Sequence, residues 1–496
     1  MADIYVSSVI GNNNANSGAT WTLAKATVAG ALAIAADGDT IYVDSAHSFS
    51  TTSTINWDAP SAGIFVRIIS VSRNGSTTTG HSGWLAGAAE VGTQFSTQFN
   101  VAVTRAQRLY IYGCDLGSTG SNTNDVRIAT AQLLGAHVAV ELESCTLRCS
   151  GTGSNSEIAL GPSAGANTSP HQIKLTNCTF IIHNNASGNG FRLGYARTDI
   201  CGGSIQYGGV NKPAVLFNGA TQTYPNVNIY DMDLSGYEKS GGAIFSVATW
   251  YGRAVLMKCK YSATPSLVTG SWPNNTGELV LINSDSGDTH NVFEYRNRLG
   301  TITENGSIYA DTGARFDGSG ISWEIVTSSS CSENEPFVTP WIMRWADETT
   351  SLTASLEVVH DSATNLNSRT AWHSFEYLGN ASFPLGSIAS GRIATPFEGT
   401  GTDWTSSSET WTGTGGFGNP NKQTFSATFT PAERSVLRGR LHIGAASKTL
   451  YLDPGLRLTG HAANPAARWT PDGAFNAEPA GGGLLIHSGM NGGLNG

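Results

Sequence analysis

A short pattern of residues recurs nine times between residues 41 and 284, and it constrains the fold of this chain more than any other feature. Each copy has the order apolar, any residue, apolar, any residue, turn former, followed by a position on which the copies can be aligned. The first apolar position is polar only once, at Thr198. The nine alignment positions are Ala46, Val71, Cys114, Cys145, Cys178, Gly203, Met232, Cys259 and Ser284.

The spacing inside each copy predicts a strand with one buried face, because apolar residues alternate with others. The turn former is Ser, Gly, Asn or Asp in eight copies and Lys258 in the ninth, and the first four types tolerate turns or left-handed backbone. Successive copies lie 25 to 43 residues apart, so the loops vary in length while the strands keep their place. Repeats of this size without intervening helices predict a parallel β-helix.

The segments outside the repeat predict other structures. Residues 3–9 predict a strand, and residues 22–36 predict a short helix that Asp37 and Gly38 end. From about residue 297, short alternating segments predict an antiparallel β-sandwich. The Ala/Pro/Gly-rich end predicts an arm that is ordered by docking onto a neighbouring subunit. The expected divisions are 1–40 for the N-terminal strand and capping helix, 41–297 for the β-helix, 298–340 for a connecting coil segment, 341–460 for the sandwich and 461–496 for the docking arm.

The composition agrees with an all-β chain and excludes several classes of partner. Charged residues make up 13% of the 496 residues and Gly accounts for 59 of them, which favours strands and tight turns over solvated helices. The formal net charge of −9 includes no basic block, so we expect no nucleic acid partner and no membrane partner. The longest apolar stretch, residues 27–36, is too short to span a bilayer, and the N-terminus shows no secretory signal.

Four of the seven cysteines fall at the alignment position of the repeat: Cys114, Cys145, Cys178 and Cys259. Such a column is either a metal or redox ladder or a stack of small buried thiols. We favour the buried stack, because Cys is among the most often buried residue types. The cysteines have neither CxxC nor Cys/His ligand spacing, so we expect no metal site and no cofactor.

Several segments resemble proteins of tailed bacteriophages. Residues 21–25 and 36–43 resemble the entry of right-handed β-helix proteins in these phages, where a short helix caps the first coil. Residues 175–180, Leu-Thr-Asn-Cys-Thr-Phe, resemble the generic coil of the same class. Residues 287–290 and 309–323, together with 428–431 and 449–454, resemble a recurrent C-terminal half of phage virion β-helix proteins.

This resemblance implies an all-β fold, with a right-handed parallel β-helix followed by the sandwich and the arm, in a structural protein of the particle that is usually oligomeric. Tailspikes of this class usually begin with a separate particle-binding domain. Here the coil pattern begins within about 45 residues of Met1, which favours attachment through the sandwich or the arm.

Aromatic residues in the loops of two successive coils are candidate binding residues. Trp250 and Tyr251 lie between strands of one coil, and Trp272 occupies a similar place in the next. Aromatic side chains bury a large area at low entropic cost, so these residues could contact a glycan or a protein interface. The alternative is that they cover the side of the coil.

Three acidic residues are the candidates for catalysis if the chain is an enzyme. Asp233 and Asp285 follow their alignment positions two coils apart, with Lys260 between them, and Asp231 occupies a turn position. Carboxylates one or two coils apart on one face would match the spacing that glycoside hydrolysis requires. The alternative is a solvated ladder of surface charges, which we favour, so we expect no catalytic residue.

These observations predict a non-enzymatic structural protein of a phage particle, either a capsid decoration or spike or a tail-associated fibre. The alternative is a receptor-binding tailspike that binds or depolymerises host surface polysaccharide, as a glycoside hydrolase or a lyase. The expected partners are capsid or tail proteins, contacted through the sandwich and the arm, two further copies in a homotrimer and, under the alternative, a bacterial surface glycan. The expected location is the virion, after synthesis in the host cytoplasm.

Overall fold

The protein divides into two compact units, the first formed by Met1–Leu279 and Ser284–His290 and the second by Val280–Asn283 and Asn291–Gly496. Only part of the sequence is described in the computed structural model, and the predicted docking arm, residues 461–496, lies outside that part. The described residues are 1–10, 14–75, 78–93, 98–118, 126–133, 138–149, 157–163, 171–182, 188–207, 212–220, 225–273, 277–286, 289–304, 323–332, 334–339, 342–346, 352–360, 371–378, 392–394, 405–410, 421–429, 435–452 and 457–459.

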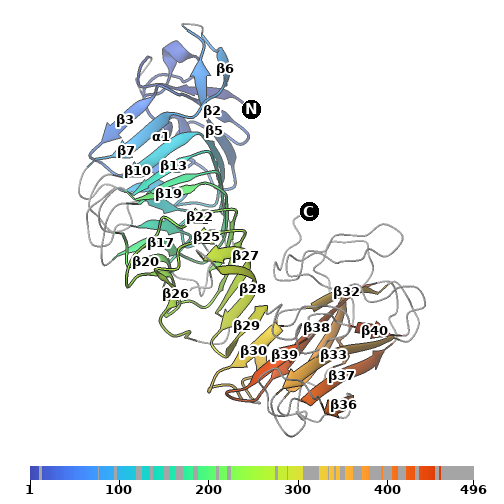
Figure 1. The fold of residues 1–496 in the computed structure, drawn as a ribbon. Coiled ribbons are helices and arrows are strands. Elements are labelled where there is room, and N and C mark those ends of the chain that lie inside the picture. The colour runs from blue at the N-terminus through green and yellow to red at the C-terminus, as the bar shows by residue number, and fades with distance from the viewer. Residues whose placement is uncertain are drawn as a thin grey trace. The chain divides into compact units, whose positions relative to one another are not determined.

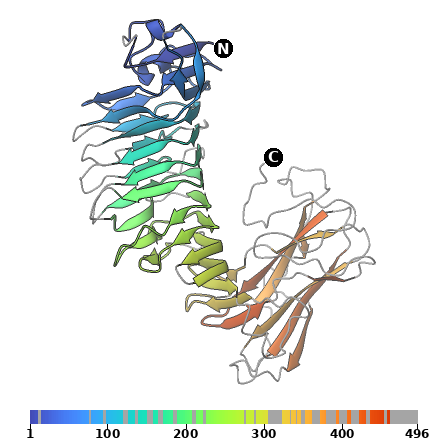
Figure 2. The ribbon, with the colours of Figure 1, turned by 45° about the horizontal axis from the view of Figure 1, so that its top comes forward.

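The first unit is a parallel β-helix, whose coils contribute one strand each to three parallel rows (Figures 1 and 2). The first row is formed by β1 (Asp3–Val6), β2 (Thr40–Asp44), β5 (Phe65–Arg73), β9 (Arg108–Tyr112), β12 (Ala139–Glu143), β15 (His171–Thr176), β18 (Ala196–Cys201), β21 (Asn226–Tyr230), β24 (Arg253–Met257) and β27 (Glu278–Ser286).

The other two rows complete the coils. The second row is formed by β3 (Ser48–Thr51), β7 (Ala88–Gly92), β10 (Cys114–Ser118), β13 (Thr146–Cys149), β16 (Thr179–Ile182), β19 (Ser204–Tyr207), β22 (Asp233–Leu234) and β25 (Lys260–Tyr261), which pairs with β27. The third row is formed by β4 (Ile55–Trp57), β8 (Phe99–Val101), β11 (Val126–Ile128), β14 (Ile158–Leu160), β17 (Asn189–Leu193), β20 (Val215–Gly219), β23 (Ala243–Ser246) and β26 (Ser266–Thr269).

The strand register follows the repeat from β5 to β24. Val140, for example, pairs with Leu109 on one side and with Ile173 on the other, as the first apolar column predicts. The register expected for the first copy was wrong, because Val43 pairs with Ser70 and not with Ile68. The reason is that β5 does not turn at Ser70 but continues to Arg73 and forms a hairpin with β6 (His81–Trp84).

The turn formers between the first and second rows adopt left-handed backbone in seven of the nine copies. In five of these copies, from Gly113 to Asp231, the N–H of the turn former donates to a carbonyl of the next coil: Asn177 donates to that of Cys201 at 2.8 Å, and Asp231 donates to that of Met257 at 3.0 Å. The hydrogen-bond ladder therefore continues through the turn. The seven residues have φ values between 47° and 69° and are Gly113, Ser144, Asn177, Gly202, Asp231, Lys258 and Asn283.

The cysteine column lies just inside this turn and is buried. The Cys178 thiol donates to the carbonyl of Leu142 in the preceding coil at 3.5 Å, and Cys145 donates to that of Ile111 at 3.5 Å. Burial raises the pKa of Cys178 to about 11 and holds that of Cys145 well above its ordinary value. None of the seven cysteines, all of which are described, forms a disulfide. The column is thus a stack of protonated thiols that bond from coil to coil.

The third row contributes a stack of aromatic rings to the interior. Phe191, Phe217 and Phe245 pair in register on successive strands. Their ring centroids are separated by 4.9 Å and 5.3 Å, and all three side chains are buried. Together with the apolar columns of the first row, this stack forms a continuous core along the β-helix.

The predicted helix over residues 22–36 is much shorter in the structure. A 3-10 turn (η1) covers Trp21–Leu23, and α1 covers only Val28–Leu32. The prediction failed because Ala24 is extended and because Thr27 caps α1, with its side chain accepting a hydrogen bond from Gly30 N–H.

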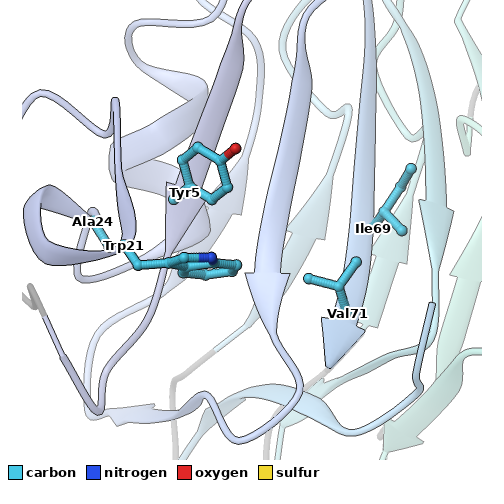
Figure 3. Close-up of a cluster of buried hydrophobic side chains, with 5 residues drawn as sticks. All are labelled: Tyr5, Trp21, Ala24, Ile69 and Val71. Atoms are coloured by element: carbon cyan, nitrogen blue, oxygen red, sulfur yellow. The ribbon is translucent and has the colours of Figure 1, made fainter. Parts of the chain in front are cut away.

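The segment before α1 packs against the outer face of the first row. Trp21 is fully buried and lies edge-on to Tyr5, with ring centroids 4.7 Å apart. Both pack with Ala24, Ile69 and Val71 (Figure 3). The indole N–H of Trp21 donates to the carbonyl of Gly80 at 3.0 Å, which ties this cluster to the turn of the β5–β6 hairpin.

A buried carboxylate joins α1 to the first coils. Glu90 is 1% exposed and accepts hydrogen bonds from the N–H of Val28 at 2.6 Å and from the indole of Trp57 at 2.8 Å. Its third partner is His47 Nε2 at 3.2 Å, and His47 Nδ1 accepts from the N–H of Ser8. These bonds fix the neutral Nε2–H form of His47 and hold the N-terminal segments onto the β-helix.

The second unit contains antiparallel strands in two sheets (Figure 1), in keeping with the predicted sandwich. β29 (Gly300–Glu304) pairs with β28 (Thr289–Asn297) and β30 (Trp323–Thr327), and the same sheet contains β33 (Leu352–His360), β36 (Thr405–Thr410), β37 (Asn421–Phe429), β39 (Thr449–Leu452) and β40 (Arg457–Thr459). The other sheet contains β31 (Phe337–Val338), β32 (Ile342–Ala346), β34 (Ala371–Leu378), β35 (Arg392–Ala394) and β38 (Ser435–Ile443).

Candidate functional site

The outer face of the first row carries a partly exposed set of aromatic and charged side chains, here named the outer-face ladder. In β9, β12, β15, β18 and β21 the apolar residues point into the core, so the alternate residues point outward. Along one outward column the pairing partners are Tyr110, Glu141, Lys174, Asp199 and Asn228.

Aromatic rings form one end of the outer-face ladder. Trp84, at the end of β6, is 50% exposed, and its ring centroid lies 4.9 Å from that of Tyr112 and 6.2 Å from that of Tyr110. An exposed aromatic surface backed by two further rings can stack against an apolar face of a ligand such as a sugar ring.

The charged end of the ladder contains three carboxylates, and each has a donor partner. The Tyr110 hydroxyl donates to Glu143 Oε2 at 2.7 Å, and burial together with this bond raises the pKa of Tyr110 well above its ordinary value. Lys174 lies 2.6 Å from Glu141, and this bond raises the pKa of Lys174. The third carboxylate, Asp199, pairs with Arg197 at 3.0 Å and accepts from Asn228 at 2.6 Å.

The predicted acidic ladder is present on the second row. Asp233, Lys260 and Asp285 pair in register on β22, β25 and β27. The Asp233 carboxylate accepts from the Ser235 hydroxyl at 2.5 Å and from its N–H at 2.9 Å, and these bonds lower the pKa of Asp233. A general acid in glycoside hydrolysis needs a raised pKa, so the lowered pKa of Asp233 does not suit that role. Asp231 occupies a left-handed turn and is exposed.

The three predicted aromatic contacts have different surroundings. Trp250 is 1% exposed, and its ring lies edge-on to Phe245 with centroids 5.8 Å apart. Trp250 therefore belongs to the core, and its ring is not a surface for a glycan. Tyr251 and Trp272 are half-buried.

The outer-face ladder was not predicted, although the sequence contains its signal. The predicted acidic ladder rests on the outward position that follows each alignment position. The outer-face ladder lies instead on the two outward positions within the first strand of each coil. In those two columns Tyr110 and Tyr112 precede Glu141 and Glu143 in the next coil. Trp84 carried no such signal, because it lies in a hairpin outside the repeat.

Comparisons with known proteins add little. No protein-family model and no curated protein matches the chain. A solved structure of the tailspike protein gp49 from Acinetobacter baumannii bacteriophage Fri1, a capsular polysaccharide depolymerase, aligns with 84% of this chain and 81% of its own chain, at 9% sequence identity and a TM-score of 0.14. A TM-score this low carries no argument about this protein.

Two further observations concern the described residues. No helix there is long and apolar enough to cross a membrane. No cluster of three or more His, Cys, Asp or Glu side chains there could hold a metal ion.

Proposed function

We propose that the chain is a structural protein of a bacteriophage particle, in which the β-helix is a stiff surface element. The observation that carries this proposal is the hydrogen-bond ladder that continues through the turns: five left-handed residues each donate an N–H to the next coil where the chain changes direction. A body bonded coil to coil, with a continuous core, resists bending more than strands joined only by loops. The sequence resemblance to phage virion β-helix proteins supports the location in a particle.

In this proposal the second unit and the arm, residues 461–496, contact capsid or tail neighbours, and three copies associate. Particles made with and without the gene for this chain test the first part. We expect an added surface projection in electron micrographs, and the protein in purified particles, only when the gene is present. Particles that look the same with and without the gene, and that do not contain the product of this gene, would refute it. A molar mass of three times 52.0 kDa for the purified chain in analytical ultracentrifugation would support the trimer, whereas the mass of a monomer would refute it.

Glycan binding is a second candidate function, because Trp84 is an exposed aromatic ring beside carboxylates and a lysine on one face. Binding of host surface polysaccharide to the purified chain tests it. We expect Trp84→Ala to lose most of the binding, whereas Leu23→Ala, which alters another exposed apolar residue, keeps it. Equal binding by both variants would remove this candidate.

Cleavage of the polysaccharide is measured in the same experiment from the length of the recovered glycan. If the glycan is shortened, and Glu141→Gln or Asp199→Asn abolishes the shortening, the depolymerase activity belongs to the outer-face ladder. If only Asp233→Asn or Asp285→Asn abolishes the shortening, the depolymerase activity belongs to the second row. Glycan of unchanged length would leave binding without cleavage.

A further inference from the structure

The outer face of the third row carries two arginines that share one buried carboxylate. Arg127 in β11 and Arg192 in β17 occupy the same outward position two coils apart, with Ala159 of β14 between them. Glu157 precedes β14, its side chain is 8% exposed, and its Oε1 lies 2.7 Å from Arg192 Nε. Asn189 donates to the other oxygen of Glu157 at 3.3 Å.

Among the described residues, this cluster has one positive charge more than it has negative charges. Two guanidinium groups face the single carboxylate of Glu157. Within the described part of the chain, the buried Nε of Arg127 has no hydrogen-bond partner. Arg192 Nε also lacks a well-aligned hydrogen bond, because its close contact with Glu157 is an ion pair of poor hydrogen-bond geometry. A half-buried guanidinium without an acceptor is costly, since it has lost water without replacing it.

The electrostatics of Arg127 agree with this imbalance. Burial and the nearby Arg192 lower the pKa of Arg127. Burial raises the pKa of Glu157, although two arginines and Asn189 act in the opposite direction. An anion bound beside Arg127 would relieve the repulsion between the two guanidinium groups.

We propose that Arg127 and Arg192 bind the carboxylate group of a small ligand at this face. A guanidinium offers a planar fork of donors that matches a carboxylate. The cluster lacks one negative charge to balance its two guanidinium groups, which suits a monovalent carboxylate better than a divalent phosphate. Neutral amides lie on either side in the same column: Asn100 pairs with Arg127, and Asn218 pairs with Arg192.

These amides favour a carboxylate ligand that also carries hydroxyl groups. Asn100 is 7% exposed, donates to Asn56 at 2.7 Å, and has an Oδ1 without a hydrogen-bond partner among the described residues. This oxygen is itself buried, so it accepts a bond from a ligand hydroxyl when the Asn100 side chain turns outward beside the arginine. The ligand class is therefore a hydroxy acid, such as a uronic acid.

Ligand-observed saturation-transfer NMR on the full chain tests the proposal, with D-glucuronate, acetate and D-glucose as probes at low salt. We expect saturation transfer to glucuronate and not to glucose. Transfer to acetate equal to that of glucuronate means that the carboxylate alone is recognised, and a larger effect for glucuronate means that the amides contribute; both support the site. No transfer to either carboxylate would overturn the proposal.

Variants place the binding at this face. Arg127→Gln and Arg127→Lys are expected to weaken glucuronate binding about tenfold, as the loss of a charge-assisted fork implies. Arg108→Gln, at an exposed arginine of the first row, should bind as the wild type does. Arg127→Gln removes a like charge beside Arg192, so its melting temperature should be no lower than that of the wild type. If it does melt at a lower temperature, Arg127→Lys, which keeps the charge, tests the binding instead. Unchanged binding by both Arg127 variants would overturn the proposal.

Discussion

Cys259 and Ser284 occupy the same position in successive coils and make the same bond. The Cys259 thiol donates to the carbonyl of Ile229 in the preceding coil at 3.3 Å, and the Ser284 hydroxyl donates to that of Leu256 at 3.3 Å. Both side chains are buried. At these two coils the column therefore accepts either a thiol or a hydroxyl as the donor, and it does not require the chemistry of sulfur.

Replacement of Cys259 tests this requirement. Cys259→Ser should lower the free energy of unfolding by about 1 kcal/mol or less, because the hydroxyl keeps the donor. Cys259→Leu should lower it by about 2–3 kcal/mol, because the larger side chain overpacks the core and loses the donor. Urea unfolding measures both. A serine variant as unstable as the leucine variant would show that the sulfur itself is required.

The thiols should respond to alkaline pH. Burial raises the pKa of Cys178 and of Cys259 to about 11, whereas an unfolded thiol ionises near the ordinary pKa of about 8.5. Between these values the folded chain holds protons that the unfolded chain has lost, so stability should be constant below pH 8 and fall as the pH rises toward 11. Urea midpoints from pH 7 to 11 measure this, and a Cys178→Ser, Cys259→Ser variant should show a smaller fall.

The left-handed turn at Asn177 should be sensitive to side-chain type. Asn177 has a φ of 51°, a region that costs a β-branched residue about 1–2 kcal/mol, so Asn177→Val should be destabilised by about that amount. Asn177→Gly should be as stable as the wild type or more so. Asn226→Val is the matched control, since Asn226 is exposed on the extended strand β21. Equal effects of valine at the two positions in thermal unfolding would contradict the assigned role of the turn.

Glu90 should matter for the N-terminal end. Glu90→Ala leaves the donors of Val28, His47 and Trp57 without their acceptor, so we expect a loss of about 3 kcal/mol or more. Glu90→Gln keeps the shape and one acceptor, and should lose less. Limited proteolysis should then cut first within residues 1–40. Cleavage that begins elsewhere would show that Glu90 does not hold this segment.

The repeat predicted the β-helix well because two requirements act on every coil. A buried column needs apolar residues, as at Ile111 and Leu142, and a reversal into the left-handed region needs Gly, Asn, Asp or Ser. Both leave a signal in one sequence. Lys258 adopts the same backbone without belonging to these types, which shows that neighbouring coils can impose the conformation.

The first coils and the functional faces were predicted less well, for physical reasons. The hairpin that carries Trp84 lies outside the repeat, so periodicity gave no indication of its position. The sequence places Trp250 in a loop as a candidate contact residue, but burial of a loop residue depends on neighbouring coils that no local pattern encodes. The cluster of Arg127, Glu157 and Arg192 likewise exists only because coils of unequal length align these residues.

Seven successive coils each carry a left-handed reversal, so the β-helix can change its length by whole coils. The reversals at Asn177 and Gly202 are 25 residues apart, and the Asn177 N–H donates to the carbonyl of Cys201, the residue before Gly202. Removing the 25 residues from Cys178 to Gly202 would join one reversal to the start of the next coil and shorten the stack by one strand spacing, about 4.8 Å. Insertions and deletions of whole coils are thus a route by which such a protein can change its reach without redesigning its ends.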